Sequence, residues 1–207
     1  MFTEHVQSRR ARREATRQQV LASAEDLFRH QGFAATTVRQ IAARAGVSVG
    51  TVMAVGDKSA LLIAIFDEWI AAVHRSRSVD PSNSTTRLTP AAAVREVMSA
   101  FEPFIDHFSR DLELSREYAA IIVRGTHQSA IFQDLAPVLI AQVNQVLSRS
   151  GLTSSAASHG ARIIFLSYLG LVMIVGDGAL SLQASVDQFR EVIRFVVSPR
   201  ATQPPAQ

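Results

Sequence analysis

The chain has 207 residues, of which 47% are hydrophobic, and its formal net charge at pH 7 is +3. This length and apolar content suffice for one large or two small folded domains and exclude an intrinsically disordered protein. The absence of cysteine excludes disulfide bonds, thiolate chemistry and cysteine-ligated metal sites.

The N-terminus and the apolar runs give no sign of secretion or membrane insertion. The N-terminus lacks the apolar core of a secretory signal. The longest apolar run, residues 163–175, is interrupted by Ser167 and is shorter than the ~18–20 residues that a membrane span requires. We therefore expect a cytoplasmic protein without a membrane partner.

The charge is unevenly distributed along the chain. Residues 1–60 carry nine Lys and Arg against five Asp and Glu, a net charge of +4, whereas the rest carries twelve against thirteen, a net charge of −1. A basic head on a neutral body is the electrostatic pattern of nucleic-acid-binding proteins. A solvated basic tail would give the same distribution.

Helical signals follow one another from the N-terminus onward, and the alternation typical of strands is scarce. A capping box formed by Thr16 and Gln19 predicts the start of a first helix, which Gly32 ends. Thr37 and Gln40 form a second capping box and open a short second helix.

A third short helix is predicted directly after the second. Gly46 ends the second helix, Ser48 is a good N-cap for a third that runs to about Ala54, and Asp57 can cap a fourth. Only Gly-Val-Ser separates the second and third helices, which is the arrangement of a helix-turn-helix. Such a pair places the N-terminal residues of its second helix at base edges in the major groove of DNA.

The second half of the chain also reads as helices. Residues 76–89 are polar and rich in Ser and Thr and predict a linker, after which Pro90 starts the next helix. A capping box of Ser185 and Gln188 predicts the start of the last helix. The helices between them are expected at about 112–124, 129–150 and 155–176. The predicted fold class is all-α.

Residues 17–62 resemble the DNA-binding head of the TetR family of bacterial regulators. The resemblance rests on the first-helix pattern VLASAEDLF, the following GF, the stretch TTVRQIAARAGVSVGT, and Lys58 before Leu61 and Leu62. Order, spacing and residue types agree over about 45 positions. The rest of the chain agrees with the family only in length and helical character.

The resemblance implies about nine helices, with a helix-turn-helix domain at residues 16–57 and a ligand-binding and dimerisation domain at residues 58–198. The sequence itself adds a basic N-terminal arm at residues 1–15 and a disordered tail at residues 199–207. A homodimer would place two recognition helices in successive major grooves of a palindromic operator on double-stranded DNA. The implied function is a transcriptional repressor that a small-molecule effector releases from the operator.

The DNA contacts implied by the resemblance are Thr37, Arg39, Ser48, Val49, Gly50, Thr51, Met53 and Lys58. The family usually has an aromatic residue, most often tyrosine, in place of Met53, and one more residue before the lysine. Met53 can pack on the DNA backbone but cannot donate a hydrogen bond, and the short stretch through Gly56 predicts a tighter turn. A second interpretation therefore stays open: a small-molecule-binding helical dimer whose head no longer reads DNA.

The remaining arginines near the head have different predicted roles. Arg44 is expected to lie in solvent. A cluster precedes the first predicted helix and consists of Arg9, Arg10, Arg12 and Arg13. Arginines of this kind can read the width of the minor groove. The alternative is a flexible tail that is attracted to DNA phosphates without sequence specificity. In both cases the arm is expected to add affinity and salt dependence.

The ligand pocket implied for the C-terminal domain has large apolar side chains and few polar anchors, which suits an apolar or aromatic small molecule. Its candidate lining residues are Trp69, Met98, Phe101, Phe104, His107, Phe108, Tyr118 and Ile122, with His107 and Tyr118 as the polar anchors. The alternative for each of these residues is an ordinary place in the core.

The last two helices are expected to pair with those of a second subunit in a four-helix bundle. The candidate interface residues are Phe165, Tyr168, Leu169, Val172, Phe189, Val192, Ile193 and Val196. The alternative is that both are core helices of a monomer.

Signals for an enzyme are missing. The six histidines show no HxxxH or HExxH spacing, and the sequence contains neither GxSxG nor a phosphate-binding glycine loop. Glu113 and Glu117 flank Arg116, which favours a surface ion-pair cluster over paired catalytic carboxylates. We therefore expect a protein that is not an enzyme and needs no metal or cofactor.

Overall fold

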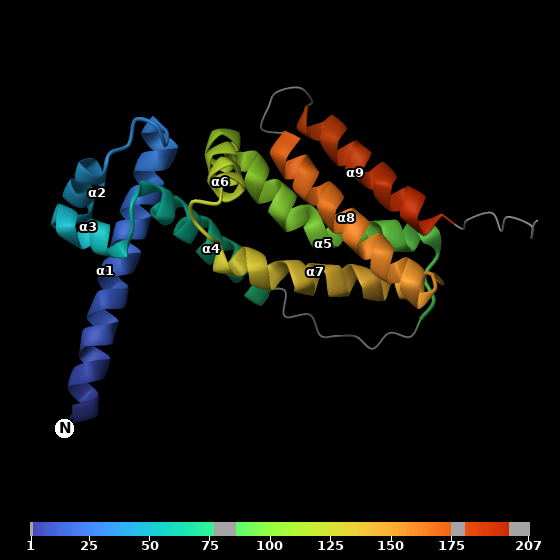
Figure 1. Ribbon diagram of the computed structural model, residues 1–207, viewed down its shortest axis with the longest axis horizontal. Coiled ribbons are helices and arrows are strands. Elements are labelled where there is room, and N and C mark those ends of the chain that lie inside the picture. The colour runs from blue at the N-terminus through green and yellow to red at the C-terminus, as the bar shows by residue number, and fades with distance from the viewer. Residues whose placement is uncertain (1, 77–85, 175–180, 199–207) are drawn as a thin grey trace, which may run out of the picture. The chain divides into compact units, whose positions relative to one another are not determined.

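The computed structural model describes residues 2–76, 86–174 and 181–198, which form nine α-helices and no strand (Figure 1). The all-α prediction is confirmed. Most of the predicted linker and the predicted disordered tail lie outside the described residues. The helices are α1 Phe2–Gln31, α2 Val38–Ala45, α3 Val49–Val55, α4 Lys58–Ser76, α5 Pro90–Arg110, α6 Leu112–Arg124, α7 Ala130–Arg149, α8 Ser154–Ile174 and α9 Leu182–Val197.

The chain divides into two compact units. Unit 1 consists of residues 1–76 and 111–132 and contains α1 to α4 and α6, whereas unit 2 consists of residues 77–110 and 133–207 and contains α5, most of α7, α8 and α9. Helix α6 therefore belongs to the same compact unit as the helix-turn-helix. The functional boundary predicted at residue 58 remains a prediction.

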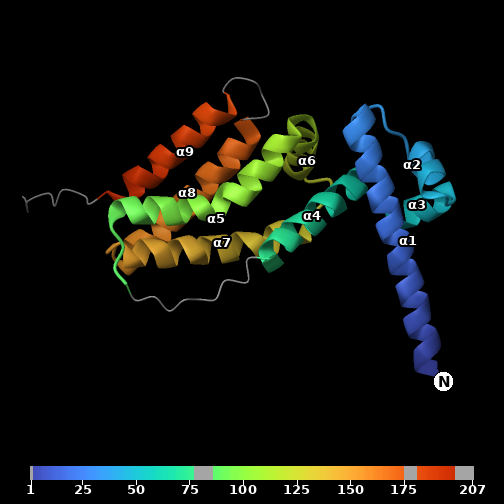
Figure 2. The same cartoon turned by 180° about the vertical axis from the view of Figure 1, so that it is seen from behind.

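The core of unit 1 is formed by apolar stripes at helical spacing. Helix α1 buries Val20, Ala24 and Phe28, against which α2 and α3 pack. Figures 1 and 2 show α2 and α3 beside the C-terminal half of α1. Leu61 and Leu62 at the start of α4 are fully buried. Because α2 and α3 pack against α1 and against each other, they need little intrinsic helical stability of their own.

The predicted start of α1 at Thr16 is wrong. The helix begins at Phe2, and the Thr16 hydroxyl donates a hydrogen bond to the carbonyl oxygen of Arg12 at 2.9 Å inside the helix. Arg, Ala, Glu and Gln dominate the preceding residues, and all are strong helix formers that extend the helix backward.

The core of unit 2 centres on three aromatic rings. Phe101 of α5 lies 4.8 Å from Tyr168 of α8 and 5.2 Å from Phe189 of α9, measured between ring centroids. Helices α8 and α9 run side by side in both views of Figures 1 and 2. Their close approach needs Gly160, because a Cβ at that position would lie 2.6 Å from Cγ1 of Val196.

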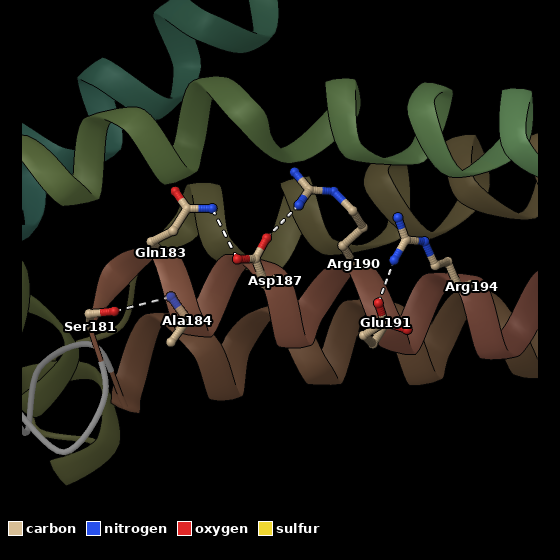
Figure 3. A network of polar contacts seen from close by, with 7 residues as sticks. All are labelled: Ser181, Gln183, Ala184, Asp187, Arg190, Glu191 and Arg194. Carbon is tan, nitrogen blue, oxygen red and sulfur yellow. Dashed lines mark hydrogen bonds and ion pairs between the residues drawn. The ribbon is translucent and has the colours of Figure 1, made fainter.

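The predicted start of α9 at Ser185 is also wrong. Ser181 caps the helix by accepting a hydrogen bond from the amide of Ala184 (Figure 3). Ser185 lies inside the helix, is buried, and its hydroxyl has no hydrogen-bond partner among the described residues. A serine can cap a helix without a Gln three residues later, because the cap needs only a side-chain acceptor. Ser181 therefore caps α9, although the capping-box pattern of the sequence is at Ser185 and Gln188.

A row of polar side chains follows α9 along one side (Figure 3). The Asp187 carboxylate accepts from Gln183 at 3.1 Å and from Arg190 at 2.5 Å, and Arg194 pairs with Glu191. These exposed pairs contribute little to stability, but they mark the solvated side of the helix.

Among the described helices, no single one is long and apolar enough to cross a membrane. Helices α3 and α4 together, Val49–Val55 with Lys58–Val73, meet the length and composition of a span across a 54° bend. Much of their apolar surface is buried in the core of unit 1.

Candidate nucleic-acid interface

Local hydrogen bonds define the turn between α2 and α3. Thr37 and Gln40 form the predicted capping box at the start of α2. Gly46 ends the helix in the left-handed region at φ 63°, and the Val47 amide donates to the carbonyl oxygen of Ala42 at 3.0 Å. Ser48 caps α3 by accepting from the amide of Thr51 at 3.1 Å. The three predicted turn residues therefore fix the angle between the two helices.

The two helices have opposite inner and outer faces. Ile41, Ala42, Ala45 and Val52 are buried and hold the pair against α1. Two of the predicted DNA contacts, Thr51 and Lys58, are half-buried. The other six are exposed: Thr37, Arg39, Ser48, Val49, Gly50 and Met53. Met53 is 51% exposed although it is a large apolar residue. This outer face presents a hydroxyl, an arginine and apolar surface together.

Two arginines of α2 have different surroundings. Arg44 is exposed to solvent, as expected, and its guanidinium pairs with Asp26 of α1 at 2.5 Å. Arg39 is exposed and forms no ion pair with any described residue. Of the two, Arg39 is the side chain available to an external anion.

The turn between α3 and α4 is short, as predicted, and consists of Gly56 and Asp57. The backbone of Gly56 is extended, with φ 164°, so the turn does not require glycine for its conformation. It requires glycine for space, because a Cβ on Gly56 would lie 2.8 Å from Cβ of Ala60. Asp57 caps α4 as predicted, accepting from the amide of Ala60 at 2.8 Å.

Lys58 is engaged within the protein. Its ammonium group donates to the carbonyl oxygens of Phe33 at 2.8 Å and Ala34 at 3.3 Å, and lies 4.4 Å from the centroid of the Phe33 ring. These contacts fasten the start of α4 to the loop between α1 and α2. An ammonium group has three donors, so a phosphate contact by Lys58 remains a prediction.

The loop after α6 carries contacts to α4 that the sequence did not predict. His127 Nε2 lies 3.2 Å from Oδ1 of Asp57, and the Ser129 hydroxyl donates to Oδ1 of Asp67 at 2.5 Å. Tyr118 of α6 stacks on Phe66 of α4 with ring centroids 4.4 Å apart. The pKa of Tyr118 is raised to about 12, mainly by burial; a hydrogen bond to Ser129 lowers the pKa and the charge of Asp67 raises it, and both effects are smaller than that of burial. The phenol is therefore neutral at physiological pH.

An open groove of about 380 Å³ lies in unit 1 between α1, α4 and the loop after α6. Its lining combines alanines of α4 with ionisable side chains from all three segments. The lining residues are Ala60, Ala64 and Ala71, the ionisable Arg17, Asp67, Glu68, Arg75 and His127, and also Ile63 and Gln128. None of these residues was predicted for a pocket. The spacing of Ala60, Ala64 and Ala71 on one face of α4 was the only signal in the sequence.

The predicted pocket residues divide between the two units. Met98, Phe101, Phe104, His107 and Phe108 belong to unit 2, and Trp69, Tyr118 and Ile122 belong to unit 1. The structure brings Tyr118 together with Phe66, and Phe101 together with Tyr168 and Phe189. Four of the eight are buried, namely Met98, Phe101, Phe104 and Tyr118, and the other four are half-buried.

The predicted dimer residues also fall into two groups. Four of them are buried within unit 2 and have little surface to offer a partner: Phe165, Tyr168, Phe189 and Ile193. The other four are half-buried: Leu169, Val172, Val192 and Val196. The most exposed large apolar side chains among the described residues of α8 and α9 were not predicted; they are Ile163, Leu166 and Phe195, at 51%, 64% and 80%.

Comparison with known proteins agrees with this architecture. Residues 20–65 match the profile described as bacterial regulatory proteins, tetR family. No protein in a search of curated sequences matches the chain significantly.

Several solved structures share the fold over most of the chain. One is a TetR transcriptional regulator from Rhodococcus sp. RHA1, 19% identical, covering 91% of this chain and 98% of its own, with a TM-score of 0.60. Another is the TetR-family repressor FadR of Thermus thermophilus in complex with lauroyl-CoA, 19% identical, covering 92% and 98%, with a TM-score of 0.59.

A third similar structure is a TetR variant from Acinetobacter baumannii AYE in complex with minocycline, 19% identical, covering 86% and 92%, with a TM-score of 0.52. At these identities the likeness concerns the fold. Residues 20–65 of this chain match the profile of the tetR family of bacterial regulatory proteins, and the chain has the fold of these regulators.

Proposed function

We propose that the protein is a dimeric transcriptional repressor that binds a palindromic DNA operator and is released from it by a small apolar or aromatic molecule. The observation that carries this proposal is the outer face of α2 and α3. Arg39 and the first residues of α3 are exposed there, whereas Ile41 and Val52 fix the helices from inside. A rigid scaffold with its polar side chains directed outward suits recognition of base edges.

The dimer is supported by exposed apolar surface on α8 and α9. Ile163 and Leu166 lie one turn apart on α8, and Phe195 of α9 is 80% exposed. Large apolar side chains exposed in this way mark contact surfaces. The half-buried Leu169, Val172, Val192 and Val196 remain candidates for the interface, whereas the four buried residues serve the core of the protomer.

The effector proposal rests on the aromatic and apolar composition of α5 and α6 and on the ligands of proteins with the same fold. Lauroyl-CoA and minocycline are bound by two of them. An effector must bind the state with low DNA affinity more tightly, and a coupling of ~1–3 kcal/mol is typical. Binding without catalysis is the role that we infer.

Operator binding is tested by titrating the protein into DNA fragments from around its own gene, followed by fluorescence anisotropy. We expect nanomolar binding to one fragment, at least about 10³-fold tighter than to random DNA. Arg39→Ala should weaken it by about tenfold or more, because an arginine at a base or phosphate contributes ~1–3 kcal/mol.

The matched control is Arg44→Ala, which removes the same charge from the same helix but from a side chain paired with Asp26. Equal losses for the two variants would contradict a specific role for Arg39. Weak binding that is uniform across a genome-wide fragment pool would favour the second candidate, a ligand-binding dimer that no longer reads DNA. The observation behind that candidate is Met53, which offers the DNA backbone no hydrogen-bond donor.

The dimer is tested by sedimentation velocity of the full chain. We expect a dimer for the wild type and a shift to monomer for Leu166→Glu and Phe195→Glu, because a carboxylate buried at an interface is strongly disfavoured. Asp187→Asn, in the polar row of Figure 3, should leave the dimer intact. A wild type that sediments as a monomer at micromolar concentration would refute the proposed dimer.

A further inference from the structure

Residues 8–15 of α1 do not contribute to the core of unit 1. Each of them is exposed, and the first buried residue that follows them is Val20. Figures 1 and 2 show this part of α1 free of α2, α3 and α4. Packing therefore does not explain the residues found there.

Four arginines define one face of this segment, which we call the basic face: Arg9, Arg10, Arg12 and Arg13. At 3.6 residues per turn they occupy an arc of about 160° around the helix. Glu14 is the one acidic residue among residues 8–15 and falls outside that arc. The segment is therefore a helix with one strongly positive side.

The basic face has no acidic partner among the described residues. Three other arginines of unit 1 are paired within the protein, namely Arg17 with Glu68, Arg29 with Glu25 and Arg44 with Asp26. The four guanidinium groups of the basic face are thus exposed and available to an anion from outside.

The basic face is unfavourable for the isolated helix. Arg9 and Arg13 are four residues apart and repel each other, as do Arg10 and Arg13 at three apart. A negatively charged polymer along this face would relieve the repulsion among these arginines.

We propose that the basic face of α1 binds the phosphate backbone of the DNA that flanks each operator half-site. This inference rests on the proposed function, because it requires DNA that is bound by the helix-turn-helix of the same unit. It also separates the two roles expected for the arginine arm. An α-helix is ~10–12 Å wide and the minor groove only ~6 Å, so the helix itself does not enter the minor groove, and the phosphates at the groove edges are the groups nearest to its arginines.

The test compares two duplexes with the same operator, one ending at the half-sites and one with ten extra base pairs, about one turn, on each side. Wild type is compared with a variant that carries Arg9→Gln, Arg10→Gln, Arg12→Gln and Arg13→Gln, over a series of salt concentrations. The charge-matched control changes four exposed arginines of α5 and α6 to Gln: Arg95, Arg110, Arg116 and Arg124.

We expect the variant to bind the long duplex at least about tenfold more weakly than wild type at low salt. The slope of log affinity against log salt should fall by about 2–3, since each phosphate contact contributes ~0.9. On the short duplex, wild type and variant should agree within about twofold, and the control variant should match wild type on both duplexes.

Three outcomes would overturn the inference. The first is an equal slope for wild type and variant on the long duplex. The second is a wild-type preference for A·T over G·C flanks that the variant loses, which indicates minor-groove reading. The third is a wild-type affinity that is the same for the short and the long duplex, together with binding to anionic vesicles that the four substitutions abolish. This result would assign the basic face to a membrane surface. A wild type without preference for the operator in the short duplex contradicts the proposed function itself.

Discussion

Replacing Gly56 by alanine is expected to destabilise the helix-turn-helix unit by about 1–3 kcal/mol, the range for overpacking a close contact. The new Cβ would lie 2.8 Å from Cβ of Ala60, so the end of α3 or the start of α4 has to move. The extended φ of 164° can be adopted by any residue, which makes the penalty steric. Urea unfolding of the full chain, monitored by tryptophan fluorescence from Trp69, measures the change.

A compensating substitution separates the clash from other effects. Ala60→Gly removes the atom that the new methyl group would meet and alone costs about 1 kcal/mol of helix stability. The double variant G56A/A60G should therefore be more stable than the sum of the two single changes predicts, by at least about 1 kcal/mol. Additive effects would show that the two positions do not touch. Gly50→Ala is the matched control, because its Cβ would meet only the Ser48 hydroxyl at 3.7 Å.

The same variant is expected to lose operator affinity. Gly46 and Ser48 hold one end of α3, and Gly56 holds the other. A shift at Gly56 changes the position of α3 relative to α4, and a recognition helix tolerates little displacement because base contacts need specific geometry. Anisotropy at a temperature where G56A is fully folded should show weaker binding, and G56A/A60G should regain part of it.

Local signals in the sequence predicted the head well. The caps at Thr37, Ser48 and Asp57 and the end of α2 at Gly46 depend on residues within one turn, so a sequence pattern can reveal them. The same pattern misled at Thr16 and Ser185, because a hydroxyl followed by Gln three residues later also occurs inside helices. Helix-forming residues before Thr16 and Ser185 extend both helices toward the N-terminus, so these two hydroxyl residues lie inside a helix.

Contacts between distant segments were not predictable in the same way. The partner of Arg44 is Asp26 on another helix, and the partner of Asp57 is His127, seventy positions further along the chain. A helical stripe also shows that a face is apolar without showing what covers it. On α9, Phe189 and Ile193 are buried in the protomer whereas Phe195 is exposed, and only the packing of α5 and α8 distinguishes them.

Truncating Phe101 to alanine is expected to destabilise the chain by about 3–5 kcal/mol, the range for removing a buried aromatic ring. Phe101 is fully buried and its ring packs against both Tyr168 and Phe189, so its loss leaves a cavity between α5, α8 and α9. Thermal and urea unfolding of F101A measure the change, with Val123→Ala at a 65% exposed site as the control.

A residue that lines an open ligand pocket contacts protein on one side only, and its truncation would cost far less while changing the response to effector. A loss below about 1 kcal/mol with altered release from the operator would therefore restore Phe101 to the pocket, whereas the larger loss places the effector site elsewhere among the predicted residues or in the groove along α4.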